Sequence, residues 1–149
     1  MAVGSYYDGE DSACFLLING LENRMKVLVC DDNVDGADTL ALVLRSHGHD
    51  VKAFYTGGTC LHEALEWKPS IAFLDIGLPD MTGYGIARQL RAKFGADILL
   101  VAVTGYDSAQ DRTVSAEAGF DMHLAKPAQL DRLVSIAATG PRGFGKQSP

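Results

Sequence analysis

The segment Ile71-Ala72-Phe73-Leu74-Asp75-Ile76-Gly77-Leu78-Pro79 decides how the rest of this 149-residue chain is interpreted. Four apolar residues precede Asp75, and a Gly and a Pro follow within four positions. A short apolar run bounded by turn residues is typical of a buried β-strand. The segment therefore predicts a strand over 71–74 that ends where Asp75 emerges. By itself this carboxylate is ambiguous, because many such residues only cap turns.

Similar apolar runs lie on both sides of this segment. They cover residues 26–30 and 98–103, with weaker runs at 51–54 and 120–124. Between them apolar residues recur at helical spacing, and we expect these stripes to be core faces. The stripes are Leu40, Ala41 and Leu44, then Ile86, Leu90 and Phe94, then Leu130, Leu133, Val134 and Ala137. Gly48 is expected to end the first helix.

Strands that alternate with helices predict an α/β domain whose parallel strands are joined by right-handed crossovers. Ligands of such sheets bind beyond the carboxyl ends of the strands. Polar residues stand at four of the predicted strand ends, so we expect them to gather at one edge of the sheet. They are Asp31 with Asp32, Asp75, Thr104 and Lys126.

Each of these residues also has a plain structural interpretation. Asp31 and Asp32 could favour the dipole at a helix N-terminus. Thr104 with Gly105 could form an ordinary turn, and Lys126-Pro127 could join a loop to a helix. These interpretations would have to hold independently at four strand ends, which favours one shared site.

The chemistry of that site follows from its charges. Two carboxylates ~5 Å apart repel by roughly 3 kcal/mol at an effective dielectric constant of ~20. Oxygen-rich sites of this kind suit Mg²⁺, which neutralises charge on a transferring phosphoryl group. Asp75 would be the nucleophile, since carboxylates form aspartyl-phosphates. Lys126 and the Thr104 hydroxyl would contact phosphate oxygens.

Composition argues against several classes of protein. The net charge of -6 argues against direct nucleic-acid binding, which needs clustered Lys and Arg. The strongest basic cluster, Arg88, Arg91 and Lys93, is expected on a solvated helix face. His47 and His49, on either side of a helix-ending Gly, predict a solvated turn rather than a metal site.

Nothing in the sequence predicts secretion or membrane insertion. The longest apolar run, 98–103, is far shorter than the ~20 residues of a membrane span. Acidic residues at positions 8–11 stand where a signal peptide carries positive charge. The odd number of cysteines lacks metal-site spacing. We expect a cytoplasmic protein with reduced thiols; its cysteines are Cys14, Cys30 in the first strand, and Cys60.

Three regions follow from these patterns. Residues 1–24 show no sustained period and predict an extension outside the main domain. Residues 25–139 carry the strand and helix signals. Residues 140–149 are rich in Gly and Pro and predict a flexible tail. No effector domain fits in these tails, so the output is expected to lie elsewhere.

Residues 25–139 resemble the receiver domain of two-component response regulators. The motifs that carry the resemblance are Val27-Leu28-Val29-Cys30-Asp31-Asp32-Asn33, Leu74-Asp75-Ile76-Gly77-Leu78-Pro79-Asp80-Met81-Thr82-Gly83-Tyr84, Val103-Thr104-Gly105 and Leu124-Ala125-Lys126-Pro127. The resemblance implies a flavodoxin-like, doubly wound sheet of five parallel strands in the order 2-1-3-4-5, with helices on both faces.

The resemblance also implies roles for the polar residues. Asp75 would accept a phosphoryl group from a phosphohistidine on a kinase or phosphotransfer protein, so the domain would react only in cis and would not be an enzyme. Mg²⁺ would be held by Asp32 directly, by Asp31 largely through water, by Asp75 and by the Gly77 carbonyl. Thr104 and Lys126 would hold the phosphoryl group, and the bond before Pro127 would be cis.

Two further features would set the switch and its lifetime. In the family, Thr104 is coupled to position 123, which commonly holds Tyr or Phe and here holds His123. That side chain would rotate into the space that Thr104 vacates; its plain interpretation is a surface residue at a strand end. Gly77 and Tyr106 would tune self-dephosphorylation, and we expect a lifetime of minutes or longer.

The expected output is altered affinity of the face formed by the fourth helix and fifth strand for a downstream protein. A homodimer through this face and the fifth helix is a further option. One alternative is an interaction module that no longer uses phosphate. Another is a small aspartyl-phosphate phosphatase, although such enzymes usually place a second acid where Gly77 stands.

Overall fold

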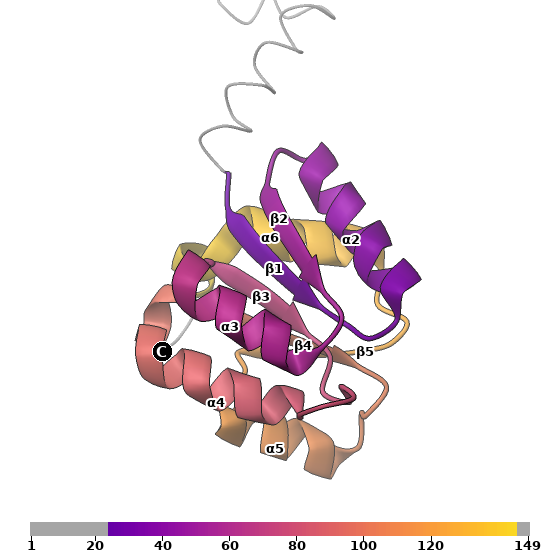
Figure 1. Ribbon diagram of the computed structural model, residues 1–149, viewed down its shortest axis with the longest axis vertical. Helices are drawn as coiled ribbons and strands as arrows, with labels where there is room; N and C mark the ends of the chain where they lie inside the picture. Colours follow the sequence, from indigo (N-terminus) through magenta and orange to yellow (C-terminus); the bar gives the residue numbers. More distant parts are fainter. Residues whose placement is uncertain (1–23, 146–149) are drawn as a thin grey trace, which may run out of the picture.

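The computed structural model describes residues 24–145, which form one five-stranded parallel sheet with helices on both faces (Figure 1). The strand order is β2-β1-β3-β4-β5, as predicted. The elements are β1 (Lys26–Cys30), α2 (Val34–Ser46), β2 (Asp50–Phe54), α3 (Gly57–Trp67), β3 (Ile71–Leu74), α4 (Gly83–Phe94), the 3₁₀ turn η2 (Gly95–Asp97), β4 (Leu99–Thr104), α5 (Ala109–Ala118), β5 (Met122–Ala125) and α6 (Leu130–Gly145).

The sheet separates two apolar cores. Successive residues of a strand point to opposite faces, so Leu28 and Val29 belong to different cores. The α2 and α6 helices cover one face, whereas α3, α4 and α5 cover the other (Figure 1). All four residues of β3 are buried, which explains its continuous apolar sequence. The predicted strands 26–30 and 71–74 are confirmed to the residue.

The last helix differs from the prediction in two ways. Leu130, predicted as part of a core stripe, is the first residue of α6 and is 41% exposed. Helical backbone also continues to Gly145 beyond a break at Gly140, where φ is 62°. A Cβ at Gly140 would lie 2.6 Å from Met25 Cε, so this glycine permits a close approach. The predicted tail therefore has helical backbone at 141–145, and its flexibility stays a prediction. The predicted extension lies outside the described residues, apart from Arg24.

Two polar predictions were wrong because tertiary contacts bury the side chains. Arg91 does not lie on a solvated face: its guanidinium donates to the carbonyl oxygens of Gly95, Ile98 and Gly119 and pairs with Asp121 at 2.6 Å. His49 is only 7% exposed, and its Nδ1 accepts the Met25 N–H at 3.1 Å. Burial lowers the pKa of His49.

The other predictions for this region agree with the structure. Gly48 follows α2 with φ of 92° and provides the expected helix-ending conformation. Cys30 is buried in β1 and Cys60 is buried in α3. Over residues 24–145, no helix has the length and apolar character needed to cross a membrane.

Candidate functional site

The acidic residues meet because β1 and β3 are neighbours in register. Cys30 pairs with Leu74, so the residues that follow, Asp31 and Asp75, emerge side by side. The Asp75 N–H donates to the Cys30 carbonyl at 2.9 Å, which extends the pairing by one residue. Carboxylate oxygens of Asp31, Asp32 and Asp75 all lie within 4.8 Å of one another. Asp75 is 8% exposed whereas Asp32 is exposed, so solvent screens the charge of Asp75 the least.

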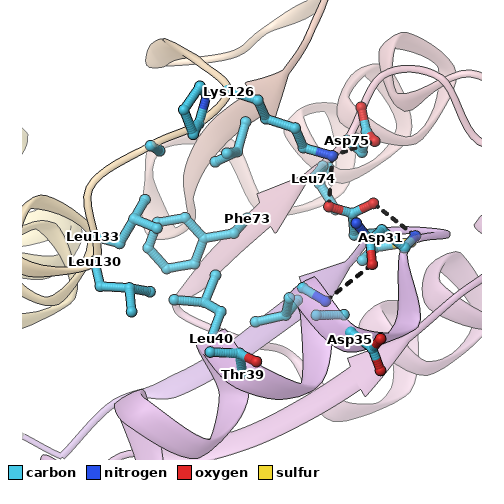
Figure 2. Close-up of a pocket in the computed structure, with 18 residues that line it drawn as sticks. Asp31, Asp35, Thr39, Leu40, Phe73, Leu74, Asp75, Lys126, Leu130 and Leu133 are labelled. Atoms are coloured by element: carbon cyan, nitrogen blue, oxygen red, sulfur yellow. Dashed lines mark hydrogen bonds and ion pairs between the residues drawn. The ribbon is translucent and has the colours of Figure 1, made fainter.

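Lys126 provides the countercharge of the cluster. Its Nζ lies 2.7 Å from Asp31 Oδ2 and 2.9 Å from Asp75 Oδ2 (Figure 2). Burial alone would lower the pKa of Lys126, but the hydrogen bonds to the two carboxylates outweigh it and raise the pKa. Burial raises the pKa of Asp31, against the opposing effect of Lys126. The lysine is thus charged at neutral pH, whereas Asp31 bears a desolvation cost.

The backbone around Lys126 fixes its position. The Lys126 N–H donates to the Thr104 carbonyl at 2.9 Å, which places the lysine beside the end of β4. The bond between Lys126 and Pro127 is cis, the form that the resemblance implied. Thr104 is fully buried as the last residue of β4, and its hydroxyl accepts the Tyr106 N–H at 3.3 Å. All five polar residues predicted at strand ends therefore lie at one edge of the sheet.

Glycines shape the segment that follows Asp75. The Gly77 N–H donates to Asp75 Oδ1 at 3.3 Å. A Cβ on Gly77 would lie 2.8 Å from Tyr106 Cε2, so the tyrosine ring rests against this glycine. At Gly83, where α4 begins, a Cβ would lie 2.4 Å from the Asp75 carbonyl oxygen. The close return of the chain beside Asp75 therefore requires a residue without a side chain at position 83.

Asp80 is a structural residue of this segment that the sequence did not reveal. Its two carboxylate oxygens accept the N–H groups of Gly57 and Gly58 at 2.7 and 2.8 Å. These groups lie in the first turn of α3, whose N-cap Thr56 makes no side-chain capping bond. The two backbone hydrogen bonds lower the pKa of Asp80. The Gly57-Gly58 pair was the available signal, because a helix that starts at glycines has no capping side chain there and leaves N–H groups unpaired.

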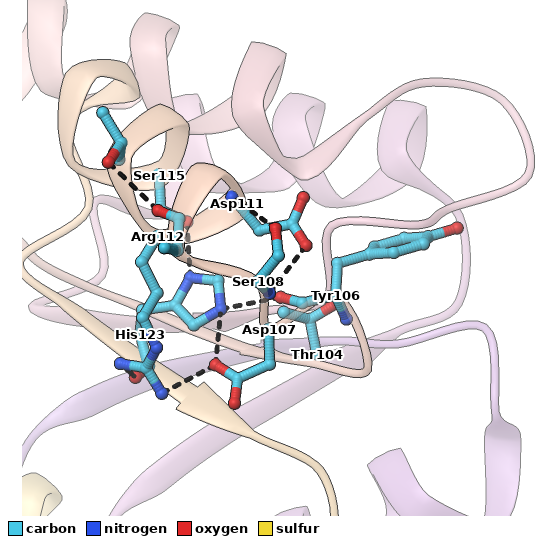
Figure 3. A network of polar contacts seen from close by, with 10 residues as sticks. Thr104, Tyr106, Asp107, Ser108, Asp111, Arg112, Ser115 and His123 are labelled. Atoms are coloured by element: carbon cyan, nitrogen blue, oxygen red, sulfur yellow. Dashed lines mark hydrogen bonds and ion pairs between the residues drawn. The ribbon is translucent and has the colours of Figure 1, made fainter.

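The His123 side chain lies in the interior. This contradicts the alternative interpretation of His123 as a surface residue at a strand end. Its side chain is 6% exposed, and both ring nitrogens have hydrogen-bond partners (Figure 3). Nδ1 lies 2.8 Å from Ser115 Oγ and Nε2 lies 2.8 Å from the Tyr106 carbonyl. The residue therefore joins β5 to α5 and to the loop that follows Thr104.

A pocket of about 690 Å³ opens from the acidic cluster along the face covered by α2 and α6 (Figure 2). Asp31, Asp75 and Lys126 line one end, whereas Leu40, Phe73, Leu130 and Leu133 line the other. Leu130 is exposed because it borders this opening. A reacting group can thus reach Asp75 from this side.

These features define a class of site: carboxylates and one lysine gathered at the carboxyl edge of a doubly wound parallel sheet. The carboxylate oxygens form a donor set that could hold a divalent metal ion, since Mg²⁺ prefers one or two protein carboxylates. Comparison with known proteins agrees with this class. Residues 27–138 match the model of the response regulator receiver domain, so the chain belongs to that family.

Relatives and solved structures support the assignment. The DNA-binding response regulator MtrA of Mycolicibacterium paratuberculosis is 33% identical over 112 residues, which cover 75% of this chain and 49% of that protein. A CheY-like receiver domain from Methanospirillum hungatei superposes with a TM-score of 0.77 at 25% identity, over 84% of this chain and 99% of that one.

A third comparison concerns a response regulator from Burkholderia pseudomallei, whose crystal structure contains a phosphorylated aspartic acid, a calcium ion and citrate. It has a TM-score of 0.69 at 28% identity and covers 74% of this chain and 64% of that one. The chain spans about half the length of the curated relatives it matches. As a receiver domain, it is a phosphoacceptor signalling domain of two-component systems rather than a classical enzyme.

Proposed function

We propose that Asp75 is the phosphoacceptor and that a phosphohistidine on a kinase or phosphotransfer protein is the donor. A carboxylate oxygen of Asp75 forms a bond to phosphorus, the phosphorus–nitrogen bond breaks, and the donor imidazole keeps the electron pair. The observation that carries this proposal is the position of Lys126 Nζ, 2.9 Å from Asp75 Oδ2 within a cluster of three carboxylates. An ammonium in that place neutralises charge on an incoming phosphoryl group.

Asp31, Asp32, Asp75 and the Gly77 carbonyl would hold Mg²⁺. The metal supplies charge neutralisation to the phosphoryl oxygens when bound. Support comes from the carboxylate oxygens within 4.8 Å of one another. The Burkholderia pseudomallei relative, whose structure contains both a phosphorylated aspartic acid and a divalent cation, is consistent with this assignment.

Thr104 and Lys126 hold the phosphoryl group after transfer. The Thr104 hydroxyl is buried at the end of β4 and accepts the Tyr106 N–H at 3.3 Å, so its own O–H can donate to a phosphoryl oxygen. Gly77 offers no side chain to orient an attacking water, and Tyr106 shields the acceptor. We therefore expect slow self-dephosphorylation, over minutes or longer.

The output is a change in the face formed by α5 and β5, which binds a downstream protein or a second copy of the chain. Thr104 lies at the end of β4 and His123 lies in β5, so the site is connected to this face. The domain itself makes no contact with nucleic acid in this proposal. MtrA is named a DNA-binding response regulator, which is a statement about that longer protein.

Phosphorylation by a small donor tests the acceptor. The chain is incubated with Mg²⁺ and acetyl phosphate, and its intact mass is measured. Wild type and the control Asp97→Asn, an exposed carboxylate in η2, should each gain one phosphoryl group. Asp75→Asn should gain none. Uptake by Asp75→Asn, or no uptake by wild type, would refute the assignment and favour a phosphate-independent interaction module.

A further inference from the structure

The imidazole of His123 is fixed on two sides (Figure 3). A carbonyl oxygen can only accept, so Nε2 carries a proton and donates to the Tyr106 carbonyl at 2.8 Å. In the neutral ring Nδ1 then accepts the Ser115 hydroxyl at 2.8 Å. Ser115 is 1% exposed in α5, so water does not compete for this bond. The imidazole ring therefore already lies inside the domain. This differs from the expected side chain that rotates inward when Thr104 moves.

Charged groups close the space around the ring. Asp107 Oδ1 lies 3.6 Å from His123 Nε2 and 2.6 Å from Arg112 Nη2. Arg112 Nη1 also donates to the His123 carbonyl at 3.1 Å. These contacts connect the loop after β4, the helix α5 and the strand β5. A substitution of His123 would therefore first alter the contacts of the loop after β4.

The Tyr106 backbone is held at both of its polar atoms. Its carbonyl accepts from His123, and its N–H donates to Thr104 Oγ1 at 3.3 Å. Its ring lies against Gly77, where a Cβ would lie 2.8 Å from Cε2 and 3.2 Å from the phenol oxygen. The Gly77 N–H in turn donates to Asp75 Oδ1. A continuous series of contacts thus connects the imidazole to the acceptor carboxylate.

We propose that His123 is a positioning residue that holds Tyr106 over Gly77 and so sets the lifetime of the phosphoryl group on Asp75. This inference rests on the proposed function. When the Thr104 hydroxyl turns toward the phosphoryl group, it releases the Tyr106 N–H. The bond from His123 is then the remaining hydrogen bond on Tyr106 among those of the described residues.

The step that His123 slows is hydrolysis. A water oxygen forms a bond to phosphorus, the bond from phosphorus to the Asp75 oxygen breaks, and the carboxylate keeps the electron pair. The protons of the water leave with inorganic phosphate and solvent. The tyrosine ring lies against Gly77 beside the acceptor, so it would restrict the access of water to the phosphoryl group from that side. Losing the hydrogen bond that holds it should speed hydrolysis about two- to tenfold, the factor that one hydrogen bond typically supplies.

The test is the rate at which purified phosphorylated protein loses its phosphoryl group, a mass of about 80 Da. The rate is measured after the phosphodonor is removed, with Mg²⁺ still present. His123→Phe fills the ring position with a residue that the family commonly has there, but it cannot donate to Tyr106. It should shorten the lifetime about two- to tenfold. His123→Gln, whose amide N–H can donate to the same carbonyl, should recover at least part of the lifetime.

Tyr106→Ala distinguishes positioning from a general structural role. In that background, His123→Phe should produce no further change, because its effect passes through the tyrosine. If the changes in lifetime caused by His123→Phe and Tyr106→Ala multiply in the double variant, the inference is overturned. An unchanged lifetime in His123→Phe would also overturn it. Urea unfolding of the same samples identifies any loss of fold. Wild type that takes up no phosphoryl group would overturn the proposed function itself, and with it this inference.

Discussion

Replacing Lys126 by Met should destabilise the domain strongly at neutral pH without Mg²⁺. The ammonium is the partner of Asp31 and Asp75, whose side chains are only 15% and 10% exposed. Breaking a buried ion pair by removing one partner typically costs about 3–5 kcal/mol, because the other charge stays buried. Methionine keeps much of the length and apolar surface of the lysine stem, so the change isolates the charge.

Proton binding limits this loss. A carboxylate without its partner can bind a proton, and the free energy of doing so depends on pH. For a carboxyl with the ordinary pKa of 3.8, protonation at pH 7 costs about 4.4 kcal/mol and at pH 5 about 1.6 kcal/mol. We therefore expect Lys126→Met to lose about 3–4 kcal/mol at pH 7 and less than about 2 kcal/mol at pH 5.

Urea unfolding followed through Trp67, the one tryptophan of the chain, measures the effect. A loss of that size lowers the midpoint by roughly 2 M urea at pH 7. Adding Mg²⁺ should narrow the gap, because the metal takes over the countercharge. Lys93→Met, at an exposed position of α4, is the matched control and should change little. Equal midpoints for Lys126→Met and wild type at pH 7, with no response to Mg²⁺, would refute the electrostatic account of the site.

Other changes test contacts around the site. Burial lowers the pKa of His49, so stability should fall as the pH drops below 6.5, and His49→Gln should flatten that dependence in thermal melts. Backbone N–H bonds lower the pKa of Asp80, so Asp80→Asn should melt earlier than wild type at pH 7, with a difference that shrinks as the pH falls below 3.8. Gly83→Ala should lose about 1–3 kcal/mol, because its Cβ would meet the Asp75 carbonyl at 2.4 Å, whereas Gly85→Ala should be neutral or stabilising. Identical melting of the two alanine variants, or unchanged pH profiles, would contradict these contacts.

The sequence predicted the sheet and the site edge because both depend on local pattern. Buried parallel strands require continuous apolar runs, and the runs at 26–30 and 71–74 coincide with β1 and β3. Polar residues at strand ends must lie at the same edge once the strands are parallel. The gathering of Asp75 and Lys126 was therefore predictable without any contact between them being known.

The predictions that failed, and the role of Asp80 that was not predicted, depended on partners far away in the chain. Arg91 has a sequence environment typical of a solvated helix face, but its acceptors lie as far as Asp121. His49 is buried through a bond to Met25, 24 positions earlier. Asp80 reaches the first turn of α3, 22 and 23 positions earlier. Helical spacing describes one element at a time, so it cannot reveal side chains that join separate elements.

The position of Arg91 has a mechanical consequence. Its guanidinium binds Gly119 at the end of α5, Ile98 before β4 and Asp121 before β5, all at the edge of the sheet opposite Asp75. The far end of α5 is therefore anchored, whereas its first turn directly follows the loop after β4. The rest of α5 is connected differently, because Arg112 and Ser115 both bind His123 in β5. A change that starts in the loop after β4 would therefore act on α5 through these two contacts, whereas the bonds of Arg91 would keep the end of the helix in place.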